Sequence, residues 1–478
     1  MLFHSLQFAF FFLVVFSLYA VLNHKRQNRM LLIASYVFYG AWDWRYLSLI
    51  LMSTTVDYFC ALGIEKSNSQ KIKKKLVALS LFANLSLLGV FKYYDFFAEN
   101  FAIFFGNLGF SVQPYFLDLV LPVGISFYTF QTISYTIDVY RKKVPASKNY
   151  LDFALYVSFF PQLIAGPIER GTRLLPQIIK PRKMTFMKIY HGGYFFLWGL
   201  FLKVFIADNL AKLVDPVFQS TGPYDGASVL LATYAFSFQI YCDFAGYSFM
   251  AIGLALCMGI HLMENFRRPY FSRNISEFWR RWHISLSSWF RDYLFTPFYI
   301  YLQKRNSIKN LPLKVKHGLA FWGTLLVTEY LLGLWHGAGW NFAFFGIYHG
   351  LAIGVYYYTR KYWDSLYWPI QIFLTYQVAC VGWLIFRATS LTQAQEMLQS
   401  IFFNFHGISQ LDLQATSLKI LGFTIILIII QIFQDWKNET LVVLRLPIVA
   451  RTILIALLMS LIITFGDFGD RPFIYFQF

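Results

Sequence analysis

The sequence predicts an all-α polytopic membrane protein with about 10–12 spans, together with interfacial and re-entrant helices. Of its 478 residues, 57% are hydrophobic and 14% are charged, and the mean hydropathy is +0.49. Soluble globular proteins carry about 25% charged residues, so this composition is typical of a chain that lies in a bilayer. Aromatic residues make up 21%, more than the belts at the membrane surfaces require, so we expect some rings to pack between helices or line a cavity.

The first apolar run, residues 8–22, is predicted to be a retained span rather than a signal peptide. Its basic residues follow the run, and no small-residue cleavage site ends it. Basic loops at 25–29, 66–75 and 141–143 fall on every second connection, which places them in the cytoplasm and the N-terminus outside. Further apolar runs occupy residues 76–91, 117–137, 151–163, 191–206, 228–262, 320–334, 340–358, 370–386, 418–433 and 448–465.

A single multi-span domain over residues 1–478 is the predicted organisation, because no repeat, low-complexity tract or soluble domain interrupts the chain. The loop 407–417 is too short to be a domain. Residues 160–168 (FPQLIAGPI) are a short run interrupted by proline and glycine. Such a run favours a re-entrant segment that lines a cavity.

The net charge of +17 has its best explanation in the membrane. Lysines and arginines cluster between the apolar runs, so positive-inside topology and anionic lipid headgroups account for them better than nucleic acid does. The four cysteines all lie within apolar segments and make no CxxC pair. Neither a metal site nor a disulfide framework is therefore predicted.

Residues 331–358 are predicted to be the span that carries the principal functional side chain, His336. An ionisable group at membrane depth costs roughly 2.5 kcal/mol or more when charged, so it is retained there mainly for a purpose. Gly333, Gly337 and Gly339 leave room for another backbone or a substrate to approach. A desolvated imidazole is pushed toward its neutral form, which suits a general base.

Residues 275–295 (ISEFWRRWHISLSSWFRDYLF) are predicted to form an amphipathic interfacial helix. Large apolar side chains recur at three- and four-residue spacing, and the charges are too many for a helix that faces lipid. A plain interfacial anchor would explain this pattern. The position of His283 beside Arg280 and Arg281 favours a functional site, because a second histidine and a potential phosphate clamp share one helix.

The remaining polar residues within apolar runs point mainly to structure. A buried Asp243 needs a partner, which we expect to be an arginine from residues 275–295. Gln131 is expected to pack between helices or line a cavity. On one continuous helix His349 would face away from His336, so core packing is its expected role. No HExxH, GxSxG, P-loop or GxGxxG pattern is convincing, which disfavours a hydrolase with its own serine nucleophile.

Several stretches together resemble the membrane-bound O-acyltransferase family, in particular its bacterial alginate O-acetyltransferase-like branch. They cover essentially the whole chain in the expected order, and WRRWHISLS and LWHG are the most diagnostic. The stretches are MLFHSLQF (1–8), LPVGISFYTFQTISYTIDVYR (121–141), FFPQLIAGPIER (159–170), YCDFAGYSFMAIG (241–253), ENFRRPY (264–270), EFWRRWHISLSSWFRDYLF (277–295), LWHGAGWNF (334–342), GWLIFRATS (382–390) and FIYFQF (473–478).

The resemblance implies a helical barrel with a tunnel through the bilayer, in which His336 is the essential histidine and His283 supports it. An acyl group, usually acetyl from acetyl-CoA as co-substrate, would pass from the cytoplasmic side to hydroxyls of an exported or cell-envelope polysaccharide. The branch often works through a periplasmic partner protein of esterase-like fold, in the bacterial cytoplasmic (inner) membrane, with no bound cofactor. The residues expected to bind substrate or donor or to line the tunnel are Trp335, Trp282, Arg280, Arg281, Asp243, Tyr241, Asn341 and Gln131.

Alternatives to this reading stay open. Residues 296–304 (TPFYIYLQK) are more similar to teichoic-acid D-alanyl transfer proteins, and Phe249 stands where the branch usually has an acidic residue. A transporter or flippase for a lipid-linked sugar or another anionic solute would use the same charged cavity without chemistry, although no inverted repeat is visible. A purely structural membrane subunit would explain the charges but not the glycines around His336.

Overall fold

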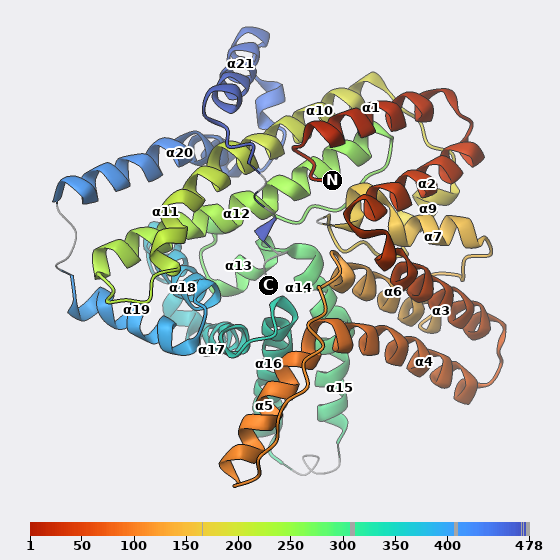
Figure 1. Ribbon diagram of the computed structural model, residues 1–478, viewed down its shortest axis with the longest axis horizontal. Coiled ribbons are helices and arrows are strands. Elements are labelled where there is room, and N and C mark those ends of the chain that lie inside the picture. Colours follow the sequence, from red (N-terminus) through yellow and green to blue (C-terminus); the bar gives the residue numbers. More distant parts are fainter. Residues whose placement is uncertain (165, 306–310, 406–409, 470, 472, 475–478) are drawn as a thin grey trace. The chain divides into compact units, whose positions relative to one another are not determined.

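The computed structural model describes residues 1–164, 166–305, 311–405, 410–469, 471, 473 and 474, with only the backbone at 410 and 411. Within these ranges every regular element is a helix and no strand occurs (Figure 1). Eight helical segments of the described chain are long and apolar enough to cross a membrane. One of them, His24–Lys66, holds two helices of 20 residues each, so eight is not a count of crossings. The predicted all-α multi-pass membrane fold is confirmed.

The chain forms two compact units. The first unit comprises Met1–Phe196 and Met250–Met263, and the second comprises Leu197–Phe249 and Glu264–Phe478. Helix α10 (Phe186–Leu200) runs across the first boundary of the sequence, and α12 (Gly226–Cys257) across the second. The other helices of the first unit, where η marks a 3₁₀- or π-helical turn, are α1 (Leu6–Val21), α2 (His24–Asp43), η1 (Trp44–Tyr46), α3 (Leu47–Lys66), α4 (Gln70–Leu88), η2 (Gly89–Tyr93), α5 (Tyr94–Asn107), α6 (Ile125–Tyr140), α7 (Tyr150–Ser158), α8 (Phe160–Leu163) and α9 (Leu174–Ile179).

Polar side chains join α3, α4 and α6 inside the first unit. The carboxylate of Asp57 is fully buried and accepts hydrogen bonds from Ser80, from Asn84 Nδ2 at 2.7 Å and from Thr136 Oγ1 at 2.7 Å. Between helices that lie in lipid, hydrogen bonds of this kind supply attraction that apolar contact alone does not. Asp57 therefore has a packing role within this unit.

The second unit contains the segments singled out in the sequence. Beside parts of α10 and α12 its elements are η3 (Phe201–Ala207), α11 (Asp208–Phe218), η4 (Pro269–Phe271), α13 (Ile275–Arg281), α14 (Ile284–Phe290), η5 (Arg291–Phe295), α15 (Thr296–Lys304), α16 (Leu313–His336), α17 (Trp340–Trp363), α18 (Trp368–Arg387), α19 (Leu391–Phe403), α20 (Gln410–Lys437), η7 (Val442–Arg445) and α21 (Ile448–Phe465).

The segment 275–295 is broken in the middle, and the prediction of one continuous helix was wrong. Helix α13 ends before Trp282, which is extended, and α14 begins after His283, whose φ of 42° is left-handed. A left-handed conformation is uncommon for a residue with a large side chain and persists where the surroundings hold it. Asn265 does so here, because its backbone oxygen accepts from Ile284 N at 2.9 Å. The turn moves His283 off the face that a straight helix would have given it.

The segment 331–358 is also two elements rather than one span. His336 is the last residue of α16, the chain is extended at Gly337 and Gly339, and α17 begins at Trp340. A side chain at Gly337 would overlap the ring of Phe342, since its Cβ would lie 2.2 Å from that ring. The break therefore places His336 at a helix end, where the returning chain folds closely over it.

Helices α16 and α17 pack against each other along most of their length. The approach is closest at Gly346, where a Cβ atom would lie 2.0 Å from the backbone oxygen of Glu329. At Gly333 a Cβ atom would lie 2.1 Å from the backbone oxygen of Phe342. Small residues that let backbones approach are typical of packed membrane helices. This pair of helices fixes where the end of α16 lies.

Candidate active site

His336 lies in an aromatic pocket at the end of α16 and is 4% exposed. Its imidazole meets Trp335, Phe345 and Phe386 edge to face, at ring-centroid distances of 5.1, 6.0 and 5.3 Å. Edge-to-face contacts of this kind orient a ring as well as bury it. The prediction that some rings pack between helices or line a cavity is met here by packing, because these rings come from α16, α17 and α18.

His283 is fully buried and its tautomer follows from its neighbour Asn265. Asn265 Oδ1 accepts from Ser285 N at 3.2 Å and from Ser285 Oγ at 2.8 Å, so this atom is the amide oxygen. His283 Nδ1 lies 3.1 Å from the same oxygen and must therefore donate to it. The lone pair of the neutral ring is then on Nε2.

The charge state of His283 follows from its burial. His283 lies outside the eight candidate spans, and burial lowers the pKa of its imidazole to about 3. The ring is therefore neutral at neutral pH. A neutral imidazole with Nδ1–H fixed by Asn265 can accept a hydrogen bond through Nε2.

Trp335 joins the two histidines. Its indole lies 5.9 Å from the His283 ring and 5.1 Å from the His336 ring, centroid to centroid. The two histidines are 53 residues apart in sequence (336 − 283). In the fold, both imidazole rings contact the indole of Trp335. The two imidazoles and this indole form the centre of the candidate site.

Further predicted residues surround this centre. Trp282 packs on Trp383 at 4.6 Å and on Tyr241 at 6.1 Å, and the Tyr241 hydroxyl accepts from Gln431 Nε2 at 2.7 Å. Asn341 Nδ2 donates to the backbone oxygen of Ala388 at 2.8 Å, which ties the start of α17 to the end of α18. These side chains support the aromatic wall.

Asp243 has a partner other than the one expected. It pairs with Lys203 at 2.6 Å, and Lys203 also reaches Asp208 at 2.8 Å. The expectation of an arginine from residues 275–295 was wrong, because Arg281 and Arg291 pair with other carboxylates and η3 presents the buried Lys203. The second Asp243 oxygen accepts from Ile474 N at 2.6 Å, so the group fastens the described end of the chain.

The two adjacent arginines diverge. Arg281 bonds Glu277 at 2.6 Å and Asp435 at 3.2 Å, which is a structural network. Arg280 is exposed and lines a cavity, and Arg281 is not among the residues that line it. The structure therefore separates the predicted phosphate clamp into one structural arginine and one that a ligand can reach.

Gln131 belongs to the first unit, not to the unit that holds the histidines. Its side chain is fully buried and donates from Nε2 to the backbone oxygen of Tyr156 at 2.6 Å. Those contacts fit the packing role that was one of its two expected roles.

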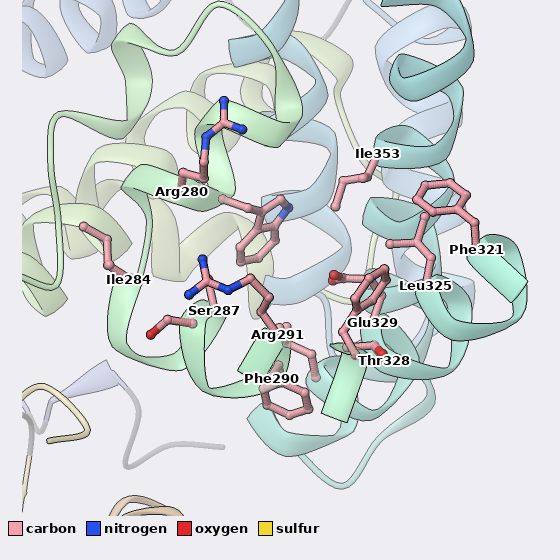
Figure 2. A pocket seen from close by; sticks show the side chains of 14 residues that line it. Arg280, Ile284, Ser287, Phe290, Arg291, Phe321, Leu325, Thr328, Glu329 and Ile353 are labelled. Atoms are coloured by element: carbon pink, nitrogen blue, oxygen red, sulfur yellow. The ribbon is translucent and has the colours of Figure 1, made fainter. Parts of the chain in front are cut away.

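A cavity of 410 Å³ adjoins the site within the second unit, a volume in the range of ligand pockets. Its walls come from α13, α14, η5, α16 and α17. Figure 2 shows the carboxyl of Glu329 directed from α16 toward the middle of the cavity, whereas Arg280 points away. The lining residues are Trp279, Arg280, Ile284, Ser287, Ser288, Phe290, Arg291, Phe295, Phe321, Leu325, Thr328, Glu329, Leu332 and Ile353.

Sequence reasoning missed Asn265 and Glu329. Glu329 is an acidic residue within an apolar helix and stands seven residues before His336 (336 − 329), a signal that the sequence does contain. Asn265 carries no such signal, because only the turn at His283 brings the two together. His349 packs on Trp279 at 5.0 Å and on Phe345 at 4.7 Å, so its predicted core role is confirmed.

The stretch that contains both histidines also matches a known protein family. Residues 145–388 match the model of the membrane-bound O-acyltransferase (MBOAT) family, and this stretch contains both histidines. The chain is 40% identical to the probable alginate O-acetylase AlgI of Pseudomonas aeruginosa, over 84% of this chain and 75% of that protein. It is 36% identical to a peptidoglycan O-acetyltransferase of Helicobacter pylori, over 84% and 80%. It is 28% identical to a teichoic acid D-alanyltransferase of Bacillus subtilis, over 65% and 85%.

Proposed function

Because this chain belongs to the membrane-bound O-acyltransferase family, we propose that it transfers an acetyl group from acetyl-CoA to hydroxyls of an exported or cell-envelope polysaccharide. The observation that carries the proposal is the placement of His283 and His336 on the same indole, Trp335. General-base activation of a hydroxyl requires a positioned base, and a second imidazole on the same indole can orient the acceptor.

In the proposed reaction His336 acts as the general base. Its imidazole takes the proton of an acceptor hydroxyl, and the oxygen attacks the thioester carbonyl carbon. The tetrahedral intermediate then collapses, the C–S bond breaks, and the thiolate takes the proton from the imidazolium. The neutral ring of His283 accepts a hydrogen bond from the acceptor through Nε2 and orients it.

The proposed donor route is the 410 Å³ cavity. Arg280 and Arg291 are both exposed and both line it, which suits a ligand with phosphates at one end. Helix α16 begins beside Lys314 and Lys316, and the positive-inside rule assigns that end to the cytoplasm. The helix would then lead from the donor side to His336.

The proposed setting is the bacterial inner membrane, with the N-terminus outside. The acceptor would be an alginate-type or similar polysaccharide, reached through a periplasmic partner protein of esterase-like fold. Support comes from the relatives named as alginate and peptidoglycan acetyl transfer proteins. The relative named as a teichoic acid D-alanyltransferase makes D-alanyl the second candidate for the acyl group.

Donor turnover tests this proposal. The purified protein in lipid vesicles is given radiolabelled acetyl-CoA and a soluble polysaccharide, and label on the polysaccharide is measured. We expect His336→Ala to reduce the rate about 100-fold or more, since a general base contributes roughly 10²–10⁴. His261→Ala is the matched control, because that side chain is exposed and belongs to the first unit. Unchanged transfer by His336→Ala would refute the mechanism, and transfer from a D-alanyl donor alone would select the second acyl group.

A further inference from the structure

Three residues that line the cavity each have a buried polar atom with no hydrogen-bond partner among the residues that the structure describes. The atoms are Trp279 Nε1, Thr328 Oγ1 and Glu329 Oε2. Trp279 is 8% exposed and Thr328 is 3% exposed, so the protein encloses both side chains. A polar atom that is buried without a partner costs free energy, and several such atoms facing one cavity indicate that a ligand supplies the partners.

These atoms lie on the path toward His336. Leu325, Thr328, Glu329 and Leu332 line the cavity at helical spacing along one face of α16, and His336 continues that face one turn further. At about 1.5 Å per residue, Glu329 is about 10 Å from His336 along the helix. A ligand that contacts Glu329 can therefore extend to the candidate base.

Trp279 approaches the same point from α13. Its indole packs on Phe345 at 6.2 Å, and Phe345 in turn packs on His336 at 6.0 Å. One phenyl ring thus separates the indole from the imidazole. Phe345 therefore connects Trp279, a residue of the cavity wall, with the histidine site.

The packing of α17 sets the direction of Glu329. At Gly350 a Cβ atom would lie 3.2 Å from Glu329 Cβ and 3.3 Å from its Cγ, so α17 lies against the stem of this side chain. With α17 on that side, the carboxyl is directed into the cavity (Figure 2). The carboxyl is therefore presented to the cavity by the same contact that joins the two helices.

The chemistry of the three atoms specifies a ligand group. Trp279 Nε1 can only donate, Glu329 Oε2 accepts, and Thr328 Oγ1 can do either. A secondary amide offers a carbonyl oxygen to the indole and an N–H to the carboxyl, and its flanking methylenes suit the apolar remainder of the lining. The exposed Arg280 and Arg291 at the same cavity suit phosphates beyond the amide.

We propose that Trp279, Thr328 and Glu329 form a subsite that recognises an amide in the arm of a pantetheine-type acyl thioester. This inference rests on the proposed function and names the residues that determine donor specificity. Sites built to hydrogen-bond a substrate group reject analogues that lack it far more strongly than apolar pockets reject a missing methylene. The chain should therefore distinguish amide-bearing thioesters from thioesters of plain alkyl thiols.

The test compares acetyl-CoA with the acetyl thioester of an alkyl thiol, which has no amide. We expect Glu329→Leu to lower kcat/KM for acetyl-CoA about tenfold, the effect of removing one buried hydrogen bond. Glu329→Gln keeps an oxygen that accepts and should retain most of the rate. Neither variant should change the rate with the alkyl thioester. Glu396→Gln, an exposed acid on α19, is the control.

Equilibrium binding of acetyl-CoA to the full-length protein in detergent separates the two proposals. Weaker binding to Glu329→Leu than to wild type supports the subsite even if no acetyl transfer is seen, and the absence of transfer then counts against the proposed function alone. Equal binding to both, equal losses with both thioesters, or no binding to wild type would overturn the subsite. Loss of binding in Glu329→Gln as well would show that the cavity recognises a positive charge rather than an amide.

Discussion

At the scale of single residues, Asn265 determines which nitrogen of His283 carries the hydrogen. Its Oδ1 accepts from Ser285 N and lies 3.1 Å from His283 Nδ1. Partners of this kind fix both the tautomer and the orientation of a functional histidine. The ring of Phe244, edge-on at 4.6 Å, holds the imidazole from another direction.

Asn265→Ala should lower kcat/KM for acyl transfer about tenfold, because His283 loses the acceptor that orients it. The measurement is the same vesicle assay, with thermal unfolding recorded in parallel. Asn107→Ala, an exposed asparagine at the end of α5, should change neither quantity. An Asn265→Ala protein with full activity would show that the tautomer of His283 is irrelevant to the reaction.

At the scale of elements, two helix breaks build the site. His283 occupies the break between α13 and α14, and His336 ends α16 just before the break at Gly337 and Gly339. A helix break leaves backbone N–H and C=O groups without their helical partners. In a membrane protein such breaks therefore occur where other parts of the protein or a cavity surround the backbone. The break at His283 brings its ring to Trp335, which precedes His336 on α16.

The close contact of α16 and α17 makes its own prediction. A methyl group at Gly346 would lie 2.0 Å from the backbone oxygen of Glu329 and would push the helices apart. Gly346→Ala should therefore lower the free energy of unfolding by about 1–3 kcal/mol, the usual cost of overpacking. The measurement is thermal unfolding in detergent.

The control for this prediction is Gly422→Ala in α20, where no atom lies within 4 Å of the added methyl. That variant should unfold like wild type and keep full activity. If Gly346→Ala behaved in the same way, the packing account of the α16–α17 contact would be contradicted.

The sequence could predict the helices better than their ends. Hydropathy located the apolar runs that form α10, α12, α16 and α18. Each of these helices belongs to a segment long and apolar enough to cross a membrane, which is the property that a hydropathy scale detects. The break at His283 had little sequence signal, since a left-handed backbone is uncommon at any residue other than glycine, although histidine adopts it more often than most. The three- and four-residue spacing of apolar side chains across 275–295 favoured one helix there, and the hydrogen bonds that Asn265 accepts from Ile284 N and Ser285 override that preference.

At the scale of the whole molecule, each compact unit has its own buried polar network. The first unit holds Asp57 among hydroxyl and amide donors, and the second holds Lys203 between Asp208 and Asp243. Composition predicted a membrane protein, and the family resemblance predicted both histidines. The partners of the buried charges could not be predicted, because Lys203 and Asp243 are 40 residues apart (243 − 203) and only the fold pairs them.

The central claim is that His336 serves an acyl transfer that passes from one side of the membrane to the other. The most direct measurement uses sealed inverted membrane vesicles from cells that make the protein and its native polysaccharide, with radiolabelled acetyl-CoA outside. We predict label on the luminal polysaccharide with wild type and about 100-fold less with His336→Ala. Equal labelling by both proteins, or solute movement without consumption of acetyl-CoA, would contradict the account.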